Sequence, residues 1–182
     1  LFNLDDDRVA ALRHRVRAKQ MGFTTASTIG ADLSGGTYLE GDRIVTTVTG
    51  VRQEICRRSE IRILGNHNVG NVMAATTYAV LCDCPLDAIR RVLATFPGLE
   101  HALEIVRERR GVRFVNDSKG TNVDATLKAL ESIDQPIWLI AGGRDKGGDF
   151  SRLAHVISRR VTRVILIGEA APMLRQAWKS VA

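Results

Sequence analysis

The sequence predicts an α/β protein with a parallel sheet in its C-terminal part. Three short apolar runs, at residues 112–115, 137–141 and 164–167, each precede a stretch with helical periodicity. Strands that alternate with helices in this way favour a parallel sheet with right-handed crossovers. In addition, polar loops follow the first two runs, at the edge of the sheet where ligands usually bind.

The N-terminal part predicts a strand end, one helix and a small β region. Residues 1–3 have the pattern of a strand end, and residues 5–20 that of a helix with its apolar side chains on one face. From residue 21 to residue 62 the pattern is that of β structure. Its clearest element is a hairpin, in which the turn-forming residues 40–43 separate two apolar pairs.

Two further helices precede a change of pattern. We expect these helices at residues 69–81 and 86–95, followed by a Pro-Gly break at residues 96–99. We therefore expect two domains, at residues 1–96 and 97–182. The helices that alternate with the strands of the second domain are expected at residues 122–133, 150–159 and 172–179.

Composition narrows the class of protein. The 182 residues are 45% hydrophobic and 25% charged, as in an ordinary packed domain. No apolar run reaches the roughly 20 residues of a membrane span. The net charge is +6, but aromatics make up only 5%, which argues against a nucleic-acid surface of interleaved basic and aromatic residues. The three cysteines lack disulfide or zinc spacing, so we expect reduced thiols in a cytoplasm and no metal site. The sequence does not give the oligomeric state, for which we favour a monomer.

The most informative stretch is the loop after the first strand of the predicted sheet. It combines an acid, a lysine and two hydroxyls: Asp117, Ser118, Lys119 and Thr121. The helix that follows offers free N–H groups and the positive end of its dipole to an anion. Asp117 could accept hydrogen bonds from ribose, and Lys119 could meet a phosphate or a carboxylate. The alternative is that Asp117 caps the helix.

A glycine-rich loop, residues 142–149, follows the second strand. Glycines allow backbone to approach a ligand closely, and Arg144 and Lys146 supply positive charge. The alternative is a turn with solvated charges. Because both loops follow successive strands of one predicted sheet, we expect them at the same edge.

A third polar stretch precedes the helix at residues 69–81. Gly65 allows a tight turn, and Asn66, His67 or Asn68 could cap the helix. The carboxamide of Asn71 offers the donor and acceptor pair that an adenine edge requires.

These residues resemble the Mur ligase family, and in particular its D-glutamate-adding branch. The stretches that carry the resemblance are Asn3-Leu4-Asp5-Asp6, Gly65-Asn66-His67-Asn68 with Asn71, Phe96-Pro97-Gly98-Leu99 with His101 and Glu104, Asn116-Asp117-Ser118-Lys119 with Thr121-Asn122, and Gly142-Gly143 with Lys146. The resemblance implies the last part of a central ATPase domain, with a small β region, followed by a Rossmann-like C-terminal ligase domain. It also implies that this chain is part of a longer protein.

The resemblance implies a role for each candidate residue. The substrates would be ATP, D-glutamate and UDP-N-acetylmuramoyl-L-alanine, with Mg²⁺ held by ligands outside this chain. His67, Asn68 and Asn71 would lie at the nucleotide base, and Asp117 would hold the ribose. Lys119 and Lys146 would be catalytic. Ser118, Thr121 and Lys146 would contact the amino-acid substrate.

One position departs from the family pattern. The family has an arginine near the ATP phosphates where this sequence has Ala102. A non-catalytic nucleotide-binding module therefore remains an alternative, as does a sibling ligase of the folylpolyglutamate synthase type.

Overall fold

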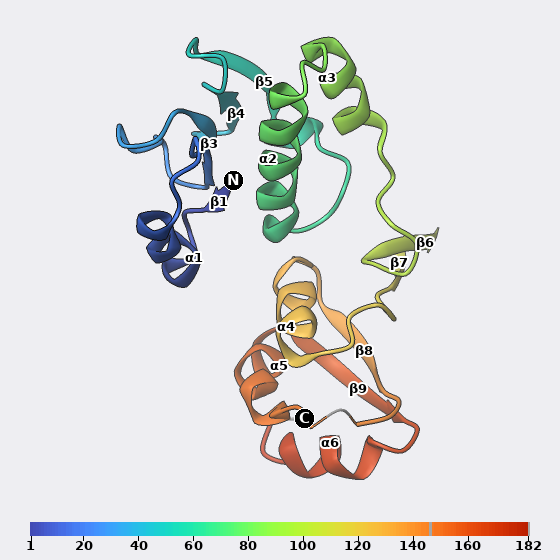
Figure 1. The fold of residues 1–182 in the computed structure, drawn as a ribbon. Coiled ribbons are helices and arrows are strands. Elements are labelled where there is room, and N and C mark those ends of the chain that lie inside the picture. Colours follow the sequence, from blue (N-terminus) through green and yellow to red (C-terminus); the bar gives the residue numbers. More distant parts are fainter. Residues whose placement is uncertain (146, 182) are drawn as a thin grey trace. The chain divides into compact units, whose positions relative to one another are not determined.

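The computed structural model describes residues 1–145 and 147–181, which form two compact units, Leu1–Pro97 and Gly98–Ala182 (Figure 1). In the described residues, no helix is long and apolar enough to cross a membrane.

The first unit is built on a five-stranded mixed sheet in the order β1-β2-β3-β4-β5. The first three strands are parallel, and β3, β4 and β5 are antiparallel neighbours. Their bounds are β1 Phe2–Asn3, β2 Gly22–Thr24, β3 Gly36–Glu40, β4 Arg43–Thr46 and β5 Gln53–Arg57. The predicted hairpin is confirmed, because Glu40 pairs with Arg43 across a turn that contains Gly41 at φ 62°.

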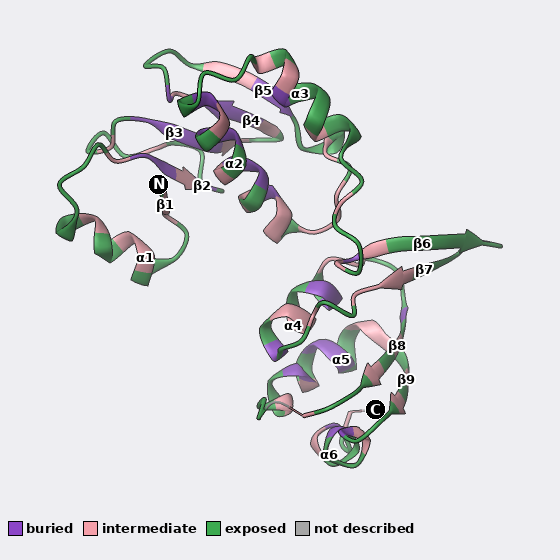
Figure 2. Ribbon diagram, turned by 45° about the vertical axis from the view of Figure 1, so that its right-hand side comes forward, coloured by how far each residue is buried: buried purple, intermediate pink, exposed green. Residues whose placement is uncertain are grey.

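Helix α2 (Asn66–Leu81) supplies most of the helical side of this core. It lies along the sheet (Figure 1) and buries Val69 and Met73 against Ile44 and Ile55. Helix α3 (Leu86–Thr95) has the bounds that the sequence predicts. Figure 2 shows the buried residues of this unit concentrated in the sheet and in α2.

The long helix expected at residues 5–20 is wrong. The structure has a short helix α1 (Asp7–Ala11), a 3₁₀ turn (Leu12–Arg15), and then extended backbone at Val16. The apolar face of the expected helix finds no core, since Leu12 is 47% exposed. Gln20 instead donates its side-chain amide to the carbonyls of Arg13 and Val16, which ends the helical segment.

The second unit contains two separate two-stranded sheets. Strands β6 (Glu104–Arg109) and β7 (Val112–Asn116) form an antiparallel hairpin. Strands β8 (Ile137–Gly142) and β9 (Val161–Ile167) form a parallel pair. The helices of this unit are α4 (Val123–Glu131), a 3₁₀ turn (Phe150–Leu153) that leads into α5 (Ala154–Arg160), and α6 (Ala171–Ala177).

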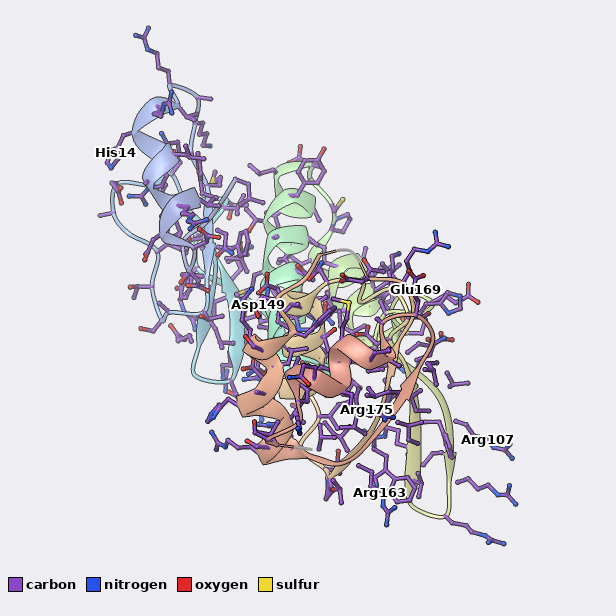
Figure 3. All side chains as sticks on the ribbon, turned by 90° about the horizontal axis from the view of Figure 1, so that it is seen from below. His14, Arg107, Asp149, Arg163, Glu169 and Arg175 are labelled. Atoms are coloured by element: carbon purple, nitrogen blue, oxygen red, sulfur yellow. The ribbon has the colours of Figure 1, made fainter. Side chains whose placement is uncertain are left out.

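The expected sheet of three parallel strands is therefore wrong. Among the described residues, β7 pairs with β6 and not with β8. The sequence analysis missed β6 because its second half is charged, and Arg107 extends from the hairpin as an exposed side chain (Figure 3). A two-residue turn, Arg110 at φ 51° and Gly111 at φ 77°, joins the two strands in the backbone conformation that favours tight hairpins.

The core of the second unit lies on one face of the β8–β9 pair. Trp178, Ile157 and Leu153 are almost fully buried there, and the indole N–H of Trp178 donates to the carbonyl oxygen of Phe150 at 2.9 Å. The opposite face of this pair is exposed and apolar. It carries Trp138, Ile140, Ile165 and Ile167.

Candidate functional site

The candidate residues lie in three segments: the start of helix α2 in the first unit and two loops in the second. We call them the Asn71 loop (residues 65–71, which are Gly65 and the first turns of α2), the Asp117 loop (residues 116–121) and the glycine-rich loop (residues 142–149). Lys146 lies outside the described residues, so its predicted place in the site has no structural account here.

The Asp117 loop is held by its own backbone. The Gly120 N–H donates to the carbonyl oxygen of Asp117 at 2.8 Å, and the Thr121 N–H donates to that of Lys119 at 2.9 Å. The side chain of Asn116 accepts from the Ser118 N–H at 3.1 Å. These short-range bonds fix the loop without using the side chains of Ser118, Lys119 or Thr121.

Asn122 begins the helix that follows this loop. Its side-chain oxygen accepts from the Ala125 N–H at 2.8 Å, which is the standard N-cap contact. The alternative that Asp117 caps α4 is therefore wrong. Asp117 instead accepts from the backbone N–H of Leu103 at 2.9 Å and is partly buried.

Three side chains of the Asp117 loop are left for a ligand. Ser118, Lys119 and Thr121 are exposed, and none of them makes a side-chain hydrogen bond or ion pair with another described residue. A primary ammonium and two hydroxyls at the start of α4 can bind a carboxylate or a phosphate, and the helix dipole favours such an anion. This is the chemistry that the sequence predicts for the loop.

The glycine-rich loop uses its first glycines for packing. A Cβ on Gly142 would lie 1.8 Å from the carbonyl oxygen of Ile167, so β8 approaches β9 at a distance that only glycine permits. The Gly143 N–H also donates to Ile167 at 3.2 Å, and Gly143 accepts from Ala170 at 2.9 Å. We expected these glycines to admit a ligand, but here they admit the neighbouring strand.

The glycine-rich loop and the Asp117 loop come together at the start of α4. A Cβ on Gly148 would lie 2.9 Å from the side chain of Val123, the first residue of that helix. Arg152 and Asp124 form an ion pair at 2.6 Å next to this contact. The two loops thus meet through α4, although β7 and β8 do not share a sheet.

Among the described residues of the glycine-rich loop, Arg144 and Asp149 are bound locally. Arg144 pairs with Glu169 at 3.7 Å, and both side chains are exposed. Asp149 accepts from the hydroxyl and the N–H of Ser151, and these hydrogen bonds lower the pKa of the Asp149 carboxyl below its ordinary value. Figure 3 shows Asp149 and Glu169 among the side chains of the unit. An open pocket beside this loop is lined by residues 148–151 and by Pro172, Met173, Gln176 and Ala177.

Asparagine side chains add hydrogen bonds to the helical backbone of the Asn71 loop. Asn68 donates its amide to the carbonyl oxygen of Leu64 at 2.6 Å, and Asn71 donates to the side-chain oxygen of Asn68 at 2.9 Å. Asn66 bonds to Arg58. Asn71 is exposed, and its own amide oxygen and second N–H are left for a ligand.

Helix α2 begins one residue earlier than a cap by Asn66, His67 or Asn68 requires. The N-cap residue is Gly65, at φ 97°, and the three residues lie inside the helix. The capping alternative for Asn66, His67 and Asn68 is therefore wrong. His67 is partly buried in the first turn of α2.

Sequence reasoning assigned no role to the turn at residues 101–104, which we call the His101 turn. Two of its residues, His101 at φ 66° and Leu103 at φ 49°, have left-handed backbone. The His101 turn makes three hydrogen bonds to the Asp117 loop. The sequence offered one signal, because His101 and Glu104 are among the residues that carry the family resemblance.

Comparison with known proteins agrees with this resemblance. A family model described as Mur ligase, glutamate ligase domain matches residues 103–182. The UDP-N-acetylmuramoylalanine–D-glutamate ligase of Alkaliphilus oremlandii is 38% identical over 179 residues, which is 98% of this chain and 38% of that protein. The ligase of the same name from Clostridioides difficile is 38% identical over 180 residues, 99% of this chain and 39% of that protein. The chain belongs to the Mur ligase family.

Solved Mur ligase structures share the fold. MurF from Acinetobacter baumannii superposes with a TM-score of 0.67 at 17% identity, over 99% of this chain and 41% of that one. MurC from Thermotoga maritima superposes with a TM-score of 0.61 at 14% identity, over 88% of this chain and 37% of that one. The chain spans under two fifths of the length of the first curated relatives, so the activity of a whole Mur ligase is a proposal for it.

Proposed function

We propose that the protein to which this chain belongs is an ATP-dependent ligase that adds D-glutamate to UDP-N-acetylmuramoyl-L-alanine in peptidoglycan precursor synthesis. The observation that carries the proposal is the combination of two findings. Relatives with this activity in their names align with nearly the whole chain, and the exposed Ser118, Lys119 and Thr121 lie at the start of α4. We place the reaction in the cytoplasm.

In this proposal, the first unit is the last part of an ATP-binding domain, and the second is most of the ligase domain. Asn71 would read the adenine edge with the amide atoms that Asn68 leaves free. His67 and Asn68 would support that contact. Asp117 would accept from ribose hydroxyls with the carboxylate oxygen that does not bind Leu103.

The reaction joins a carboxylate to an amine. The acceptor carboxylate takes the γ-phosphoryl group of ATP, and the amine of D-glutamate then displaces phosphate from the acyl phosphate. Anionic groups crowd such a site, so cations are needed to stabilise the transition state. We assign this role to Lys119 and Lys146. Ser118, Thr121 and Lys146 would hold the carboxylate of D-glutamate.

Mg²⁺ would balance the phosphate charge when bound. In the described residues, no group of three or more His, Cys, Asp or Glu side chains is placed to hold a metal ion, so we assign no Mg²⁺ ligand to this chain. The sequence also has no Gly-x-x-x-x-Gly-Lys-Ser/Thr loop for the ATP phosphates. The rest of the protein would supply both.

The proposal is tested with the full-length protein. Phosphate release should require ATP, UDP-N-acetylmuramoyl-L-alanine and D-glutamate together, and L-glutamate or other amino acids should not replace D-glutamate. Turnover with a different amino acid would indicate a sibling ligase. ATP binding without turnover would indicate the nucleotide-binding module, which the alanine at position 102 favours.

Lys146 and Thr121 test the amino-acid site within this proposal. Lys146→Ala should raise the KM for D-glutamate strongly and the KM for ATP little, and Thr121→Val should do the same more mildly. The loss of one charged contact in a dry site is worth roughly 2–4 kcal/mol. An equal increase in both KM values would indicate that Lys146 contacts the phosphates instead.

A further inference from the structure

We propose that Glu104 is a positioning residue for the nucleotide site, which it serves by closing the His101 turn against the Asp117 loop. The inference rests on the proposed function, because that function assigns ribose binding to Asp117. It adds a residue that does not touch substrate and a chain of contacts through which that residue acts.

The first contact closes the His101 turn itself. A carboxylate oxygen of Glu104 accepts from the backbone N–H of His101 at 2.8 Å. The same oxygen lies 3.5 Å from Nδ1 of the His101 ring. Glu104 is partly shielded from water, with 34% of its side chain exposed, so the contact is not a freely solvated surface pair.

The His101 turn then reaches the Asp117 loop through three bonds. The His101 carbonyl oxygen accepts from the Lys119 N–H at 3.0 Å. The Leu103 N–H donates to a carboxylate oxygen of Asp117 at 2.9 Å. Nδ1 of His101 lies 2.8 Å from the side-chain amide nitrogen of Asn116, which can donate to it in the neutral Nε2–H tautomer. One turn therefore holds both Asp117 and the backbone of Lys119.

The backbone of the turn needs this support. Left-handed conformations at His101 and Leu103 are costly for residues with a Cβ, and they persist only where the surroundings fix them. Leu103 is anchored by burial, at 8% exposure. His101 is exposed, and its backbone N–H is held by Glu104. Loss of Glu104 should let His101 leave the left-handed region and withdraw the Leu103 N–H from Asp117.

The consequence for Asp117 is specific. With one carboxylate oxygen fixed by Leu103, the carboxylate has a defined orientation and the other oxygen is kept for a ribose hydroxyl. Without that bond, the carboxylate can rotate. Part of the free energy of nucleotide binding must then be used to order it. The Ser118 and Thr121 side chains make no hydrogen bond with the His101 turn. Removal of Glu104 should therefore weaken the binding of ATP more than the binding of D-glutamate.

The experiment compares three variants of the full-length protein. Glu104→Ala should raise the KM for ATP roughly tenfold, the effect of losing one hydrogen bond to a charged group, and leave the KM for D-glutamate within about twofold. Glu104→Gln keeps an acceptor for the His101 N–H and should recover most of the loss. Glu108→Ala is the matched control, since Glu108 lies on the same strand and pairs with Arg113 at 3.6 Å. It should change neither value.

A second measurement does not depend on ligase activity. Amide hydrogen exchange at Leu103 and Lys119 should accelerate at least tenfold in Glu104→Ala and stay unchanged in Glu108→Ala. Unchanged exchange and an unchanged KM for ATP in Glu104→Ala would overturn the inference, as would equal increases in both KM values. Absence of D-glutamate-dependent turnover in the wild-type protein would contradict the proposed function. The hydrogen-exchange result would still decide whether Glu104 holds the Asp117 loop.

Discussion

The Asn71 loop and the Asp117 loop stand at the starts of α2 and α4, but they use the side chains assigned to substrate in different ways. In the Asn71 loop, asparagine side chains add to the backbone bonds of the helix: Asn68 binds the backbone of Leu64, and Asn71 binds Asn68. In the Asp117 loop, the structure is made by backbone bonds, by the Asn116 and Asp117 side chains and by the Asn122 cap. The side chains that we assign to substrate are thus part of the scaffold in the first loop and mostly independent of it in the second.

This difference separates stability from activity in the two loops. Substitutions of Ser118, Lys119 or Thr121 in the Asp117 loop should affect catalysis alone, because they remove no side-chain hydrogen bond or ion pair to a described residue. Substitutions in the Asn71 loop should affect both, because each amide that could meet the nucleotide also holds its neighbour. Three sets of variants examine this contrast.

The largest effect is expected at Lys119. Lys119→Ala in the full-length ligase should lower kcat by about 10²–10³-fold, because one preorganised charge at the reacting groups is lost. The free energy of unfolding should not change, since the exposed Lys119 side chain makes no hydrogen bond or ion pair with a described residue. Steady-state kinetics and urea unfolding measure the two quantities. Lys128→Ala, at an exposed position on α4, is the matched control. A large loss of stability in Lys119→Ala would contradict the contrast.

A smaller effect is expected at the cap of α4. Asn122→Ala should reduce the free energy of unfolding by about 1 kcal/mol, because the Ala125 N–H loses its acceptor. Asn122→Asp keeps an acceptor and should retain most of the stability. Thr121→Ala, one residue earlier, should leave stability unchanged. Urea unfolding followed by circular dichroism compares the three variants, and an unstable Thr121→Ala would show that the loop depends on that side chain.

The smallest effect is expected in the Asn71 loop. Asn68→Ala should cost roughly 0.5–1 kcal/mol of unfolding free energy, because it leaves the Leu64 carbonyl without its partner and releases Asn71. It should also raise the KM for ATP. Asn71→Ala keeps the bond between Asn68 and Leu64, so it should raise the KM for ATP at a lower cost in stability. Equal costs in the two variants would remove the distinction between scaffold and ligand contact in this loop.

The sequence predicts elements well where local pattern and tertiary packing agree. The hairpin around Gly41 and the helix α3 follow from turn residues and from apolar periodicity, and the core confirms both. The helix predicted at residues 5–20 fails because its apolar face meets no partner, so periodicity alone does not sustain it. Strand β6 escapes prediction because a charged, exposed strand has neither an apolar run nor alternation.

The site shows the same limit at a finer scale. The sequence identifies Ser118, Lys119 and Thr121 as candidates, because polar residues between a strand and a helix suggest a ligand. It does not distinguish Asn122 from Asp117 as the helix cap, since both side chains can accept from a first-turn N–H. For the His101 turn, the sequence offers only the family resemblance at His101 and Glu104 and no sign of its conformation. Left-handed backbone at histidine and leucine is not a local preference, and it exists here through contacts with a segment distant in sequence.

The placement of the two tryptophans makes the second unit observable by itself. Both Trp138 and Trp178 follow Gly98, so intrinsic indole fluorescence of the 182-residue chain comes from this unit alone. Trp178 is 2% exposed and should emit at short wavelength, whereas Trp138 is 66% exposed, lies under the Arg163 guanidinium and should be open to acrylamide quenching. A red shift of the indole emission on denaturation would therefore report unfolding around Trp178. The first unit contains no tryptophan and contributes nothing to this emission.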